Sequence, residues 1–204
     1  MSRTECHPRN IINFNTLNTM QTIQIKGVKR ENFGKKSAKD IRRENLIPCV
    51  LYGNGGETIH FSVETAEAKK LIYTPKSYIV EINIDGNIEK GVMRETQFHP
   101  VKDYCQHIDF FRVVAGKPVA IEIPVAIVGN SEGVKAGGKL QVLRRKLAVS
   151  GLEENLLDEL VIDITNLGVG KTINIGDLNF EGLTLLQPAS TSVVAVAATR
   201  QSGK

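Results

Sequence analysis

The stretch SYIVEINIDGNIEKGVMRETQF, Ser77 to Phe98, gives the strongest indication of the fold of this chain. Two runs of alternating apolar and polar residues flank Asp85 and Gly86. Alternation with a period of two is typical of a strand with one buried face, and Asp-Gly favours the two-residue turn of a β-hairpin. The stretch therefore predicts an antiparallel hairpin and assigns this half of the chain to a class that contains a β-sheet.

Further elements are predicted on both sides of the hairpin. Ser37 is expected to cap a short helix over 38–45, and Pro48 is expected to end that segment. The residues NGG, Asn54 to Gly56, predict a turn. Additional strands are predicted over 20–27, 49–53, 58–63 and 105–113, and a second helix over 64–73. We interpret 20–113 as a mixed α+β domain.

The composition changes after residue 113. Nine of the eleven aromatic residues lie between Phe33 and Phe111, and VAGKP at 114–118 has the Gly and Pro of a linker. Strands are then predicted over 119–128, 139–150, 159–164, 172–175, 183–186 and 193–199, with no convincing helix. We therefore expect an all-β domain over 119–199, followed by a short tail, 200–204.

Charge is concentrated near the start of the first domain. Residues 20–50 contain eight basic and three acidic residues, although the net charge of the whole chain is only +4. One basic patch on a nearly neutral protein indicates a polyanionic partner, and the alternative is a solvated helix face. The 41% apolar content excludes general disorder, and the 5% aromatic content argues against a deep cofactor pocket.

The cysteines and the N-terminal residues indicate the compartment. Cys6, Cys49 and Cys105 are odd in number and widely spaced, which favours a reducing environment. Residues 1–19 lack the apolar run of a signal peptide, and no later run is long enough to span a membrane. We expect a cytosolic protein without a membrane partner, in which 1–19 form a disordered tail or follow a start codon assigned too early.

The segment QFHPVKDYCQHIDFF, 97–111, holds the main candidates for chemistry. If it is a strand, alternation places Cys105, His107 and Asp109 on one face. These residues, together with His99, could bind zinc, catalyse a hydrolytic reaction or contact a polar partner such as RNA. A phosphate-loop interpretation of GVGKT, 168–172, is excluded because Thr165 occupies the position of the first Gly, and a strand is predicted to follow.

An imidazole and a carboxylate on a strand face can hydrogen-bond ribose hydroxyls and base edges, and a nearby basic helix supplies charge for an RNA backbone. GKKSAKDIRRENLIPCVLYG, 34–53, and QFHPVKDYCQHIDFFRV, 97–113, resemble the bacterial general-stress-protein Ctc family, large-subunit ribosomal proteins that bind 5S ribosomal RNA. PVAIEIPVAIVGNSEGVKAGGKLQVLRRKLAV, 118–149, and DITNLGVGKTINIGDL, 163–178, resemble the second domain of its long, two-domain members.

The resemblance implies a small antiparallel β-barrel with short helices, docked on the loop E region of 5S RNA, followed by a mainly-β domain. It further implies a monomer within the cytoplasmic ribosome, without cofactor, metal or catalysis, whose second domain contacts other ribosomal proteins or 23S RNA. Asp40 stands where relatives often carry a basic residue, so a contact there is in doubt. The RNA-binding residues implied by motif position are Arg30, Arg42, Arg43, Tyr52, His107 and Asp109, with Lys35, Lys36 and Lys39 as expected phosphate contacts.

Two rival hypotheses remain at this point. One is a zinc-binding or hydrolytic protein that uses His99, Cys105, His107 and Asp109, and stoichiometric zinc in the purified protein would favour it. The other is an RNA-free stress or chaperone-like protein that acts through its β domain. Co-sedimentation with ribosomes at low and high salt separates the second rival from a ribosomal protein.

Overall fold

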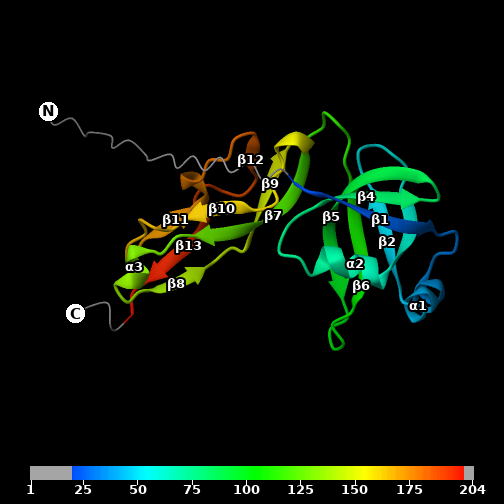
Figure 1. The fold of residues 1–204 in the computed structure, drawn as a ribbon, viewed down its shortest axis with the longest axis horizontal. Coiled ribbons are helices and arrows are strands. Elements are labelled where there is room, and N and C mark those ends of the chain that lie inside the picture. The colour runs from blue at the N-terminus through cyan, green and yellow to red at the C-terminus, as the bar shows by residue number, and fades with distance from the viewer. Residues whose placement is uncertain (1–19, 200–204) are drawn as a thin grey trace.

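The computed structural model describes residues 20–199, and the predicted tails, 1–19 and 200–204, lie outside them. Figure 1 shows two β units arranged along the long axis of the molecule, the first coloured blue to green and the second green to red. The expected fold class, an α+β barrel unit followed by a mainly-β unit, is confirmed. No helix within 20–199 is long and apolar enough to cross a membrane.

The first unit is a closed barrel of six strands in the order β1-β3-β2-β6-β5-β4. Four neighbouring pairs are antiparallel, whereas β1 with β4 and β2 with β6 are parallel. Closure leaves no free edge along most of the sheet, which removes sites for strand-to-strand aggregation. The strands are β1 Thr22–Lys29, β2 Leu46–Tyr52, β3 Ile59–Glu64, β4 Ile79–Ile84, β5 Asn87–Phe98 and β6 Cys105–Arg112.

The predicted hairpin is β4 and β5. Asp85 and Gly86 both have positive φ, 50° and 93°, as a two-residue turn that follows the twist of the strands requires. The alternation of β4 places Val80, Ile82 and Ile84 in the barrel core. A buried pair of rings, Phe61 and Phe110, with centroids 5.8 Å apart, fills the same core. The alternating pattern therefore places the hydrophobic side of this hairpin correctly.

Two helices flank the barrel, α1 Lys35–Arg43 and α2 Thr65–Ile72. The predicted Ser37 cap is wrong, because α1 begins three residues earlier than predicted, at Lys35 after Gly34, with no side-chain cap. The Ser37 hydroxyl instead donates to the carbonyl of Asn32. The prediction that Pro48 ends a segment is also wrong. Pro48 lies inside β2, where it pairs with Ser62 of β3 before the parallel pairing with β6 begins at Cys49.

The second unit contains two sheets. A four-stranded sheet has the order β10-β7-β9-β12, and a three-stranded sheet has the order β11-β13-β8. The predicted strand 139–150 is divided, because residues 143–145 carry the chain from one sheet to the other. The strands are β7 Val119–Val128, β8 Lys139–Val142, β9 Lys146–Gly151, β10 Leu160–Asp163, β11 Thr172–Asn174, β12 Leu183–Leu185 and β13 Ser192–Ala197.

Short helical turns in this unit were not predicted. Ser131 caps a four-residue helix, α3 Glu132–Lys135, by accepting from the amides of Gly133 and Val134. Two 3-10 turns, Glu153–Asn155 and Ile175–Asp177, connect strands. The GVGKT segment is a loop between β10 and β11, in which the Gly170 amide donates to the Val196 carbonyl. That amide is therefore engaged within the fold and is not presented to a phosphate.

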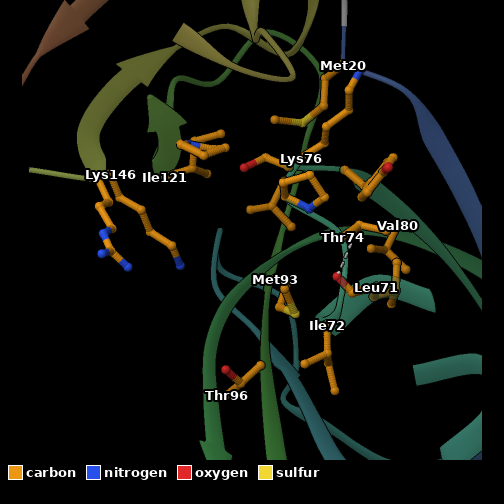
Figure 2. Close-up of a pocket in the computed structure, with 16 residues that line it drawn as sticks. Met20, Leu71, Ile72, Thr74, Lys76, Val80, Met93, Thr96, Ile121 and Lys146 are labelled. Atoms are coloured by element: carbon orange, nitrogen blue, oxygen red, sulfur yellow. Dashed lines mark hydrogen bonds between the residues drawn. The ribbon is translucent and has the colours of Figure 1, made fainter. Parts of the chain in front are cut away.

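The two units share a packed junction. Met20, Ile79, Val92 and Val113 from the first unit belong to the hydrophobic core of the second. Asp158, 1% exposed, accepts the Gln21 amide at 2.8 Å on Oδ1 and lies 3.5 Å from the Lys76 ammonium on Oδ2. A cavity of about 340 Å³ lies beside this junction. Lys146 lies on one side of it, and Met93 and Thr96 of β5 lie on the other (Figure 2).

Candidate nucleic-acid interface

Strand β6 carries a bulge that changes which residues share a face. Its register with β5 shifts between the pairs Gln97–His107 and Phe98–Cys105, so that Gln106 is the extra residue on β6. Beyond the bulge Cys105 turns into the barrel core instead of lying beside His107. The expectation that Cys105 shares the face of His107 and Asp109 is therefore wrong.

His107 and Asp109 form a hydrogen-bonded pair on the outer face of β6. The distance from His107 Nδ1 to Asp109 Oδ1 is 2.7 Å, and the side chains are 27% and 23% exposed. A carboxylate only accepts hydrogen bonds, so Nδ1 of the neutral ring must carry the shared proton. In that tautomer Nε2 is an acceptor, and the second carboxylate oxygen of Asp109 is also an acceptor. The pair suits donors such as a ribose hydroxyl or a base amino group.

Strand register shows what surrounds this pair. Residues directly opposite each other in neighbouring strands point to the same face. Val50 of β2 lies opposite both His60 of β3 and Asp109 of β6, and Asp109 lies opposite Glu95 of β5. His60, Val50, Asp109 and Glu95 thus form a row across the outside of the barrel, which we call the transverse row.

Tyr52 lies on the same outer face, one step further along β2. Its ring meets that of Phe111 edge to face, with centroids 5.9 Å apart, and Phe111 is opposite Tyr52 in the register. The Arg94 guanidinium lies 5.6 Å from the centre of the Phe111 ring. This arrangement gives an aromatic surface with a cation above it, which can support bases or riboses.

Helix α1 supplies most of the positive charge. Lys35, Lys36 and Lys39 are exposed, and none of the ion pairs among the described residues includes them. Arg43 lies 3.3 Å from Asp40, so the acidic residue that departs from the family pattern engages this arginine. The helix lies at the end of the molecule remote from the second unit (Figure 1).

Arg42 and Arg30 are held by the protein itself. The Arg42 Nε–H donates to the Gln106 carbonyl at 3.0 Å, which fixes α1 beside the bulge and next to His107. The Arg30 guanidinium donates to the Asn32 carbonyl at 3.3 Å and contacts the Ser37 hydroxyl at 3.5 Å. Burial lowers the pKa of Arg30 from its ordinary value. Both arginines shape the interface as well as contributing charge.

The residues proposed for zinc do not converge. His99 Nδ1 accepts the amides of Val101 and Lys102, and burial raises the pKa of the Cys105 thiol and of the nearby Cys49 thiol. A metal ligand must be a thiolate, which a raised pKa disfavours. Within 20–199 no group of three or more His, Cys, Asp or Glu side chains is placed to hold a metal ion.

Several residues on this face were not found from the sequence. Glu95 and Gln97 of β5 lie opposite Asp109 and His107 of β6. Arg94 lies over the Phe111 ring, and His60 packs against Phe33 at the other end of the transverse row. Alternation alone could not have placed them, because β5 also carries a register shift between Met93 and Glu95. The available signal was His60 itself, which lies in the strand predicted over 58–63, after the NGG turn that follows the strand over 49–53.

Comparisons with known proteins support a ribosomal assignment for both units. The Ribosomal L25p family matches residues 25–110, and the family Ribosomal protein TL5, C-terminal domain, matches residues 118–200. Large ribosomal subunit protein bL25 of Porphyromonas gingivalis is 47% identical over 182 residues, which cover 89% of this chain and 95% of the relative. The bL25 proteins of Phocaeicola vulgatus and Bacteroides thetaiotaomicron are 44% and 40% identical, each over 89% of this chain and 94% of the relative.

A barrel of the L25p kind joined to a TL5-type β unit defines a class of two-domain ribosomal proteins. At 40–47% identity over most of its length, the chain belongs to the bL25 family of large ribosomal subunit proteins. This membership confirms the resemblance to the long, two-domain form. The family consists of structural proteins of the large ribosomal subunit, so a non-enzymatic protein of the cytoplasmic ribosome is also confirmed.

Proposed function

We propose that this protein binds the loop E region of 5S ribosomal RNA through the outer face of its barrel. The contacting residues are Arg30, Lys35, Lys36, Lys39, Arg42, Arg43, Tyr52, His107 and Asp109. The observation that carries the proposal is the hydrogen bond between Arg42 and the Gln106 carbonyl, which holds a basic helix directly beside the His107–Asp109 pair. Charge for a backbone and acceptors for bases or riboses thus adjoin on one surface.

The two parts of this surface have different roles. The α1 lysines are exposed ammonium groups on flexible side chains, and such groups attract phosphates without reading sequence. The His107–Asp109 pair is hydrogen-bonded, partly buried and rich in acceptors, and a carboxylate is unfavourable beside phosphate unless it accepts from a defined donor. The helix therefore sets affinity and position, and the pair supplies discrimination between loop E and an ordinary duplex.

A salt titration with Lys36→Ala tests the proposal. Each phosphate contact releases counterions, so the logarithm of the binding constant should fall with the logarithm of salt concentration with a slope on the order of four to six. Lys36→Ala should reduce that slope by about one and weaken binding to loop E and to unrelated duplexes equally. Fluorescence anisotropy with labelled RNA measures both quantities.

Glu64→Ala is the matched control for this titration, because it removes an exposed charge from the end of β3, outside the residues of the proposed surface. It should leave the slope unchanged. A wild-type protein whose binding does not respond to salt would contradict the electrostatic part of the proposal.

A further inference from the structure

An exposed aromatic ring stands at the end of the transverse row. Phe33 lies in the short loop between β1 and α1, and its side chain is 63% exposed. Its ring packs against His60, with centroids 4.8 Å apart and planes inclined by 60°. His60 supports one side of the ring and leaves much of the rest open to solvent.

The loop that carries Phe33 is held in place. The Asn32 carbonyl accepts from both the Arg30 guanidinium and the Ser37 hydroxyl. The Arg30 amide donates to the His60 carbonyl at 2.9 Å, which ties the start of the loop to β3. The exposed ring is thus already positioned before any ligand binds, and little conformational entropy is lost on binding.

The ring also belongs to the proposed RNA surface. His60 and Asp109 both lie opposite Val50, and neighbouring strands are about 4.8 Å apart, so the backbones of His60 and Asp109 are about 10 Å apart. Lys36 shares a shallow hollow with Phe33 and brings an unpaired ammonium group to it. Asp40 and Glu44 line the same hollow, and Asp40 is paired with Arg43.

We propose that Phe33, supported by His60, is a stacking platform for one unpaired or bulged nucleobase of the bound RNA. The Lys36 ammonium would contact the phosphate of the same or the next nucleotide. Every base has a π-face, so an aromatic ring beside a cation is a general solution for holding an unstacked base. The inference rests on the proposed function and adds to it a contact of another kind, since a neutral ring releases no counterions.

Replacing Phe33 separates stacking from charge. Stacking of a base on an aromatic side chain contributes directly to affinity, so Phe33→Ala and Phe33→Leu should each weaken binding to a loop E fragment by about tenfold. Phe33→Tyr should bind as the wild type does. The salt slope should stay unchanged in all three variants, in contrast to the reduction expected for Lys36→Ala.

Tyr73→Leu is the matched control, because Tyr73 is similarly exposed, at 66%, but lies after α2 and outside the transverse row. It should bind as the wild type does. Thermal melting should show no loss of stability for the Phe33 variants, because the ring is largely in water.

A second readout uses the absence of tryptophan from the chain. Phe33→Trp introduces a single indole, and stacking on a base should quench its fluorescence and protect it from acrylamide when RNA binds. Binding without quenching, or wild-type affinity in Phe33→Leu, would overturn the platform and leave the proposed function standing. A wild-type protein that binds no 5S RNA would overturn the proposed function itself.

Discussion

The contact between His107 Nδ1 and Asp109 Oδ1, 2.7 Å long, determines which groups this pair can offer to RNA. Asp109 fixes the ring and its tautomer, and Nε2 and the second carboxylate oxygen remain as neighbouring acceptors. Neither group has a favourable interaction with phosphate while the ring is neutral. The pair therefore acts at the level of single hydrogen bonds to the nucleotide.

Asp109→Asn should reduce the preference for loop E over an unrelated duplex, without a uniform loss of affinity for RNA. The amide keeps the size of the side chain but replaces an acceptor by a donor, and a buried partner left unpaired costs about 1–3 kcal/mol. Loss of a negative charge also favours the binding of any polyanion, so the affinity for an unrelated duplex should stay unchanged or rise. The expected result is a fall in the ratio of loop E to duplex affinity, measured by competition with unlabelled RNA.

His107→Ala should show the same fall in that ratio, because Asp109 and His107 act as one hydrogen-bonded unit. If Asp109→Asn binds loop E as tightly as the wild type, the carboxylate is structural, and the assignment of this pair to recognition fails.

At the scale of elements, α1 is the least independent part of the barrel unit. The nine-residue helix has no buried side chain, and helices this short are marginal in water without tertiary contacts. The hydrogen bond from Arg42 to the Gln106 carbonyl is one of the contacts that hold it on the barrel. The position of the positive charge thus depends in part on a side chain of the same helix.

Arg42→Ala should loosen α1 and lower RNA affinity by more than the loss of one charge. Amide hydrogen exchange over Lys35–Arg43 should accelerate, because the helix loses its connection to β6. Arg43→Ala is the matched control, since Arg43 is exposed and pairs only locally with Asp40. Equal exchange rates in the two variants would show that Arg42 does not hold the helix.

The elements differ in how far the sequence predicts them. The Asp85–Gly86 hairpin is predictable because alternation and turn chemistry agree over 22 residues. The side of the barrel on which Cys105 lies is not predictable from the sequence. A bulge adds one residue to β6, so the alternation of inward and outward side chains is reversed in the part of the strand before the bulge. The resemblance to a known family identifies His107 and Asp109 as candidates. Their mutual hydrogen bond and their relation to His60 depend on strand register, which a single sequence does not contain.

At the scale of the whole molecule, a buried carboxylate joins the two units. Asp158 belongs to the second unit, and its side chain accepts from Gln21 and neighbours Lys76 in the first. Its backbone carbonyl accepts the Ser77 amide. No sequence pattern predicts this role, because a lone Asp before a strand is usually solvated. On the barrel, the sequence does carry a signal for the junction: Ile79 and Val92 are apolar although they point outward, and both pack into the core of the second unit.

Asp158→Ala should uncouple the two units. It leaves the Gln21 amide and the Lys76 ammonium without their partner, at a cost of about 1–3 kcal/mol. The urea midpoint should fall, and exchange of the Gln21 amide should accelerate. Asp158→Asn should behave closer to wild type, because the amide oxygen can still accept from Gln21.

Lys90→Ala serves as the control for the junction. It removes the more exposed ion pair with Glu153, which also connects the two units, and exposed pairs contribute little. An unchanged urea midpoint in Asp158→Ala would show that the apolar contacts alone hold the junction.

Recognition of loop E by the barrel face is tested by the affinity of the protein for two 5S RNA fragments. One fragment contains loop E, and in the other a regular duplex of equal length replaces it, so that the phosphate charge is the same. We expect binding to the first fragment to be at least about tenfold tighter, a difference of about 1.4 kcal/mol. Equal affinity for the two fragments, with the same salt slope, would show that the barrel face attracts charge without recognising loop E.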